Sequence, residues 1–122
     1  MTAKREKTLS EFVVVWEFCV RPDQQRAFEK AYAPDGVWGT FFRRGDGYVG
    51  TELIRDREEP LRYLTIDVWQ SRQAYELFKK KNRAEYQAID QRCESLTRTE
   101  KLIGEFQSVE QRARRSRKKK HD

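Results

Sequence analysis

The chain has 122 residues, of which 37% are hydrophobic, 12% aromatic and 38% charged, and its formal net charge is +6. The length suits a single domain with one core, and the aromatic content excludes a wholly disordered chain. No apolar run approaches the roughly 20 residues of a membrane-spanning helix, and the charged first ten residues lack the apolar segment of a secretory signal, so we expect a cytoplasmic protein.

The positive charge is concentrated at the two ends of the chain. Residues 110–122 contain seven basic and two acidic side chains, and residues 1–10 contain three basic and one acidic side chain. We predict a flexible N-terminus over residues 1–10, a folded domain over residues 11–109 and a disordered basic tail over residues 110–122. Nucleic acid is not an expected partner, because no aromatic residues are interleaved with the basic side chains of the tail.

The first predicted element is a strand over residues 12–20, where β-branched and aromatic residues occupy both alternating sets of positions. A helix follows, and Pro22 and Asp23 suit its first turn: proline has no amide hydrogen to leave unpaired, and aspartate complements the helix dipole. Its apolar stripe is formed by Ala27, Phe28, Ala31 and Tyr32, and Pro34 ends it.

A second, short helix and a β-hairpin come next. The short helix is indicated by Val37, Trp38, Phe41 and Phe42, which are spaced by four in pairs, and Gly45 closes it. Strands are predicted over residues 48–56 and 62–69, joined by the polar turn of residues 57–60. These two strands make the hairpin.

Another helix begins after Ser71, which is a natural N-cap. Asn82 is expected to break or bend this helix, and a further helix carries Tyr86, Ile89, Cys93 and Leu96 at spacings of three and four. The last strand is predicted over residues 102–106. The second half of the domain therefore reads as a split helix followed by a strand.

The order βαββαβ, with both helices split, predicts an α+β fold of the ferredoxin-like type, in which helices cover one face of an antiparallel four-stranded sheet. On the third strand we expect the helices to be faced by Leu64, Ile66 and Val68, and the opposite face to carry Tyr63, Thr65, Asp67 and Trp69. The first strand is largely apolar on both faces, with Glu17 as the exception. A second subunit is the expected cover for the second face, which predicts a homodimer.

Three carboxylates fall inside predicted strands, namely Glu17, Glu52 and Asp67. A carboxylate desolvated there has a raised pKa that suits proton abstraction, but structural ion pairs with neighbouring arginines are the commoner role of such residues. Four aromatic side chains could wall a cavity for a flat ligand, or simply pack in the core: Tyr32, Trp38, Phe41 and Phe42. Both alternatives stay open at this point.

Histidine and cysteine chemistry has little support in the sequence. The chain has two cysteines, Cys19 and Cys93, and one histidine, His121, so no cluster has the ligand count of a zinc site. Cys93 lies on a helical apolar stripe, which favours a buried small hydrophobe, and no histidine of residues 11–109 could activate a serine or cysteine nucleophile. We therefore expect neither a metal site nor a catalytic triad.

Several segments together resemble the antibiotic biosynthesis monooxygenase superfamily. They are VVVWEFCVRP from Val13, FEKAY with PDGVWGTFFR between Phe28 and Arg43, GYVGTELIRD from Gly47, and RYLTIDVWQSRQAYELF from Arg62. The resemblance spans residues 12–106 and implies a dimeric α+β barrel, in which the sheets of a homodimer face each other and each subunit has a cavity between sheet and helices.

The same resemblance implies a function. Some relatives oxygenate aromatic polyketides without metal or flavin, whereas the haem-cleaving branch is similar in fold only, because this chain offers no histidine near the expected pocket. We expect a binding protein for hydrophobic small molecules, and a cofactor-independent monooxygenase of aromatic or quinol substrates if it is an enzyme. Substrate would be held by Trp16, Tyr32, Trp38 and Phe42, and Glu17 or Asp67 would be the base. The alternative is a non-catalytic binding or regulatory dimer whose basic tail contacts an acidic partner.

Overall fold

The computed structural model describes residues 10–109. The predicted basic tail and the first nine residues lie outside this range. Within it, the strands are β1 (Phe12–Val20), β2 (Tyr48–Arg55), β3 (Arg62–Trp69) and β4 (Thr97–Gln107). The helices are α2 (Gln25–Tyr32), α3 (Val37–Phe42), α4 (Arg72–Lys81) and α5 (Arg83–Cys93), with single 3₁₀ turns η1 (Pro22–Gln24) and η2 (Glu94–Leu96).

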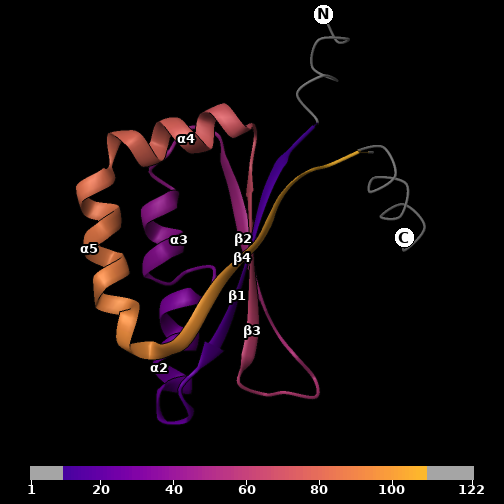
Figure 1. The fold of residues 1–122 in the computed structure, drawn as a ribbon. Helices are drawn as coiled ribbons and strands as arrows, with labels where there is room; N and C mark the ends of the chain where they lie inside the picture. Colours follow the sequence, from indigo (N-terminus) through magenta and orange to yellow (C-terminus); the bar gives the residue numbers. More distant parts are fainter. Residues whose placement is uncertain (1–9, 110–122) are drawn as a thin grey trace, which may run out of the picture.

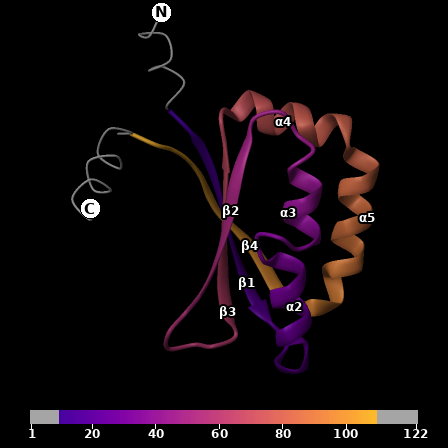
Figure 2. The ribbon, with the colours of Figure 1, turned by 180° about the vertical axis from the view of Figure 1, so that it is seen from behind.

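The four strands form one antiparallel sheet in the order β2-β3-β1-β4, which is the ferredoxin-like arrangement predicted from the sequence. All the helices lie against one face of this sheet, and the other face is uncovered in the single chain (Figure 1). The view from behind shows the same two layers, with the β2–β3 turn extending away from the helices (Figure 2). The last strand is longer than predicted, because β4 pairs with β1 along nearly its whole length.

The prediction for the two faces of β3 was wrong. Tyr63, Thr65 and Trp69 are the buried residues of this strand and face the helices, whereas Leu64, Ile66 and Val68 lie on the uncovered face. The reason is volume: the space between sheet and helices is wide enough for large aromatic rings, and the aliphatic side chains occupy the flatter outer face. Asp67, which alternates with them, therefore points to the helices.

The core between the layers is mainly aromatic. Trp69 is fully buried and contacts the rings of Phe42, Tyr48, Tyr75 and Phe78, so one side chain joins α3, α4 and the hairpin. Phe28 stacks on Tyr32 with ring centroids 4.3 Å apart and holds α2 against β1. Burial of these rings is the main source of stability, since each removes a large apolar area from water.

Local signals set the ends of the helices. The Ser71 hydroxyl accepts a hydrogen bond from the Ala74 amide at 3.0 Å, as predicted for an N-cap of α4. Asn82 separates α4 from α5, also as predicted. The turn before β2 needs Gly47, whose φ of 94° lies in the left-handed region that side chains disfavour. In the described part of the chain, no helix is both long and apolar enough to span a membrane.

Candidate active site

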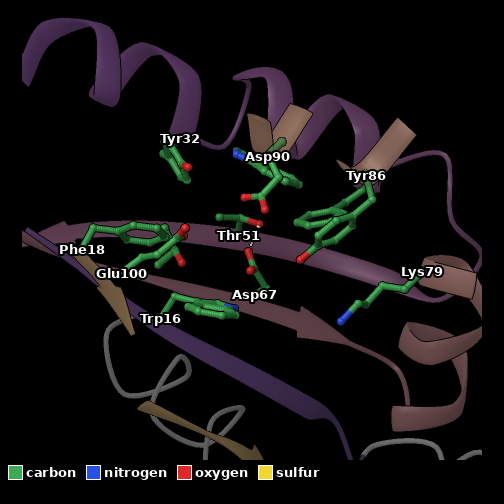
Figure 3. A pocket seen from close by; sticks show the side chains of 12 residues that line it. Trp16, Phe18, Tyr32, Thr51, Asp67, Lys79, Tyr86, Asp90 and Glu100 are labelled. Atoms are coloured by element: carbon green, nitrogen blue, oxygen red, sulfur yellow. Dashed lines mark hydrogen bonds between the residues drawn. The ribbon is translucent and has the colours of Figure 1, made fainter. Parts of the chain in front are cut away.

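A cavity of about 410 Å³ lies between the sheet and the helices. This volume falls in the range of small-molecule sites. Its aromatic lining comes from Trp16, Phe18, Tyr32, Trp38, Phe42 and Tyr86, and its polar lining from Thr51, Thr65, Asp67, Lys79, Asp90 and Glu100. Figure 3 shows these side chains converging on one space from both layers. Each of the four strands and four α-helices contributes at least one of them.

Two carboxylates line the cavity from the sheet, Asp67 on β3 and Glu100 on β4, and Asp67 is the more buried of the two. Its Oδ1 accepts a hydrogen bond of 2.7 Å from the Thr51 hydroxyl on the neighbouring strand (Figure 3), and Thr51 is in turn 2.5 Å from the Tyr48 hydroxyl. Desolvation raises the pKa of Asp67 to about 6, and the Thr51 hydrogen bond only partly offsets this rise. Among the ion pairs of residues 10–109, none involves Asp67. Such a carboxylate is poised to exchange a proton near neutral pH.

The four aromatic residues expected to hold a substrate all line this cavity. Trp16 extends from β1, and Tyr32, Trp38 and Phe42 descend from α2 and α3. The Trp38 ring centroid is 6.2 Å from that of Tyr32 and 5.7 Å from that of Phe42, so the three form a continuous wall. They pack in the core as well as lining the cavity, so both alternatives left open by the sequence apply to them. Phe41 packs in the core and is not part of this lining.

Glu17 is placed elsewhere. It pairs with Lys101 and Leu64 across the sheet and therefore lies on the uncovered face, whereas Trp16 and Phe18 beside it face the cavity. Its Oε2 accepts a 2.6 Å hydrogen bond from Arg62, which also binds Asp56. The structural ion pair was the commoner role expected for such residues, and Glu17 makes one. The two candidate bases are thus on opposite faces of the sheet.

Several lining residues were missed by the sequence reasoning. Tyr86 belongs to the predicted apolar stripe of its helix, and Asp90, which no prediction covered, follows Tyr86 by four residues and so shares its face. Glu100 fell in a segment that was not predicted as a strand. The i, i+4 spacing puts Tyr86 and Asp90 on one side of the helix, but only the packing of α5 over the sheet shows that this side faces the cavity.

Burial also alters the phenols around the cavity. Desolvation raises the pKa of Tyr86 to about 12, and the charges of Asp90, Asp67 and Glu100 add to the rise. Burial raises the pKa of Tyr32 further still. Both phenols therefore stay protonated at neutral pH and can donate hydrogen bonds to a ligand oxygen.

The sequence matches the family model of the antibiotic biosynthesis monooxygenases over residues 11–91, which is more than half of the chain. The chain belongs to this family. The resemblance noted from the sequence is thereby confirmed. No curated protein is similar enough to the sequence to count as a match.

Several solved structures with low sequence identity share the fold of this chain. A Bordetella bronchiseptica protein assigned to the antibiotic biosynthesis monooxygenases is 20% identical, with a TM-score of 0.66 over 83% of this chain and 99% of that one. SnoaB, a cofactor-independent oxygenase from Streptomyces nogalater, is 22% identical, with a TM-score of 0.62 over 83% of this chain and 95% of that one. A Pseudomonas aeruginosa protein is 14% identical, with a TM-score of 0.61 over 83% and 96% of the two chains.

Proposed function

We propose that this chain is a cofactor-independent monooxygenase that oxidises a hydrophobic hydroxylated aromatic or quinol, with Asp67 as the base. The observation that carries the proposal is a desolvated carboxylate with a pKa of about 6 that faces an aromatic-walled cavity. A non-catalytic dimer that serves only for assembly would be expected to have a filled interior. The open cavity therefore favours an enzyme. Membership of the monooxygenase family and the fold shared with SnoaB, a cofactor-independent oxygenase, support the same activity.

The chemistry needs no electron donor other than the substrate. Asp67 takes the hydroxyl proton of the bound substrate, and the resulting anion is electron-rich enough to reduce O₂ and form a carbon–oxygen bond at a ring carbon. The protonated Asp67 returns its proton to the new peroxide, which loses water to leave a carbonyl. One oxygen atom of O₂ enters the product and the other leaves as water, and the substrate supplies all four electrons.

The protein contributes position and desolvation. Trp16, Tyr32, Trp38 and Phe42 would hold the ring system against the sheet, so that its hydroxyl lies beside Asp67. The Thr51 hydroxyl, which hydrogen-bonds Asp67, orients the carboxylate. Exclusion of water keeps the pKa of Asp67 close to the working pH, where a base is most effective.

We also propose that the working form is a homodimer in the cytoplasm. The uncovered sheet face carries Val13, Val15, Leu64, Ile66 and Val68, and an aliphatic surface of this kind is rarely left in water. A second copy of the same face is its simplest cover. Cys19 and Cys93 are both free, which suits a reducing compartment.

The activity is tested with 1,8-dihydroxyanthrone, whose enol tautomer carries a hydroxyl group conjugated to the single ring carbon that O₂ oxidises. Wild-type protein should accelerate O₂ uptake above the uncatalysed rate, and ¹⁸O₂ should place one label in the product and one in water. Asp67→Asn keeps the shape of the side chain but removes the base, so the rate should fall by roughly 10²-fold or more.

Glu17→Gln is the matched control. It removes the same charge from a neighbouring strand, but on the face away from the cavity, so it should leave the rate unchanged. Circular dichroism of both variants checks that the fold is kept. Equal turnover by wild type and Asp67→Asn would remove Asp67 from the mechanism, and purified protein carrying stoichiometric flavin or haem would refute the cofactor-free proposal.

A further inference from the structure

The cavity carries more negative charge than its proposed chemistry uses. Asp67 lies on the sheet side, and two further carboxylates line the same space, Asp90 from α5 and Glu100 from β4. Both are exposed and so lie at the mouth. Figure 3 shows the Asp90 carboxylate directed toward Thr51 and Asp67, and Glu100 beside the ring of Phe18.

The three charges act on one common volume. The charges of Asp90, Asp67 and Glu100 each contribute to the raised pKa of the Tyr86 phenol, after the larger effect of desolvation. The pKa of Glu100 is itself raised, first by desolvation and then by the charge of Asp90. A cation placed among these groups would therefore interact with all three of them at once.

The protein supplies no paired cation for the two carboxylates at the mouth. Within residues 10–109, neither Asp90 nor Glu100 takes part in an ion pair or a side-chain hydrogen bond. The lining has one ammonium group, that of Lys79, and it is held over the rings of Tyr75 and Tyr86, 4.9 and 5.3 Å from their centroids. Figure 3 shows Lys79 and Glu100 at opposite ends of the lining.

The ligand for this charge is organic rather than a metal ion. No three carboxylate, cysteine or histidine side chains of the described residues are close enough together to hold a metal ion. The carboxylates are instead separated by aromatic surface, including Trp16 and Phe18, whose centroids are 6.5 Å apart. Aromatic faces attract ammonium groups as well as rings, so the lining combines the two kinds of group that recognise an organic cation.

We propose that the cavity selects an aromatic ligand that carries a positively charged amine, with the amine held at the mouth by Asp90 and Glu100. This inference rests on the proposed function only in taking the cavity as the ligand site, and it does not require turnover. It also suits the proposed reaction: the ammonium group would offset the negative charge that develops on the substrate once Asp67 has taken its proton.

The test is a binding measurement with three probes that share one ring system and differ in charge. They are 2-(1-naphthyl)ethylamine, which is a cation at pH 7, 2-(1-naphthyl)ethanol, which is neutral, and 1-naphthylacetate, which is an anion. Isothermal titration calorimetry on the full chain should give the cation a Kd at least about 10-fold lower than the neutral alcohol, and the anion the weakest binding.

The variant Asp90→Asn/Glu100→Gln keeps the shape of the mouth and removes its two charges. It should reduce the preference for the cation over the alcohol to about 3-fold or less, while the Kd of the alcohol stays unchanged. The matched control is Glu58→Gln/Glu59→Gln, which removes two exposed charges from the β2–β3 turn, outside the cavity lining, and should keep the full preference.

Each failure has its own signature. Equal binding of the three probes by wild type would overturn the amine inference but leave the cavity as an aromatic site, and so would a preference that survives in the Asp90→Asn/Glu100→Gln variant. A lack of binding by all three probes would overturn both the inference and the proposed function. Selective binding of the cation by a protein that consumes no O₂ would support the inference and count against the oxygenase.

Discussion

At the scale of single residues, Asp67 combines a functional gain with a cost in stability. Its pKa is about 6 in the folded chain, against 3.8 for an unperturbed aspartate. Above pH 6 the carboxylate is ionised in both folded and unfolded chains, and the folded chain bears the full desolvation cost. As the pH falls from 6 toward 3.8, the folded chain binds the proton first and this cost disappears.

Asp67→Asn should therefore stabilise the protein at pH 7.5. The shift in pKa corresponds to at most about 3 kcal/mol in the free energy of unfolding, and the gain should nearly vanish at pH 4, where Asp67 is already neutral in the folded chain. Urea unfolding of wild type and variant at both pH values measures the difference. A variant that is less stable than wild type at pH 7.5 would show that the carboxylate is not desolvated.

Only some of the residues that line the site could be predicted from the sequence, and the physical reason differs between residues. Asp67 and Trp16 stand out because a carboxylate and an indole interrupt strands of β-branched residues. Asp90 and Glu100 do not stand out, since an acidic residue on an exposed position of a helix or strand looks the same whether it faces bulk water or the mouth of a cavity. Only the packing of α5 over the sheet distinguishes the two cases.

At the scale of elements, the order and type of helices and strands could be predicted well because capping and breaking signals are local. Ser71, Asn82 and Pro34 act on the backbone within four residues of themselves. The orientation of β3 could not be predicted in the same way. Alternation reveals two sets of side chains but not which set faces the helices, and both sets of β3 contain apolar residues.

The N-cap of α4 offers a direct test at this scale. Ser71→Ala removes the acceptor of the Ala74 amide, so the free energy of unfolding should fall by about 1 kcal/mol, measured by urea unfolding at a fixed protein concentration. Ser71→Asn retains a side-chain acceptor and should lose only a small part of this. If both substitutions cost the same, the Ser71 hydroxyl contributes nothing as a cap.

At the scale of the whole molecule, the uncovered face of the sheet sets the expected assembly. We expect wild-type protein to sediment as a dimer at micromolar concentration, since obligate interfaces of this type bury on the order of 2,000 Å² or more in total. Ile66→Asp puts a charge at the middle of this face, between Val15 and Glu52 on the flanking strands, and should produce monomers.

The control for this prediction is Leu77→Asp. Leu77 is 54% exposed on α4 and lies away from the sheet, so the same change of side chain there should leave the dimer intact. A wild-type protein that sediments as a monomer would contradict the expected assembly. A dimer that persists in Ile66→Asp would place the contact on another surface.

The alternation of β3 has a consequence for how this sequence can evolve. Thr65 and Asp67 face the cavity, while Leu64, Ile66 and Val68 face outward. Adjacent positions of one strand therefore line the candidate active site and the proposed dimer interface in alternation. Substitutions can therefore tune chemistry and assembly separately, one position at a time. Insertion or deletion of a single residue cannot change one without the other, because it would exchange the inward-facing and outward-facing side chains and turn Asp67 away from the cavity. Length changes in this part of the protein should accumulate in the β2–β3 turn, which extends away from the helices (Figure 2).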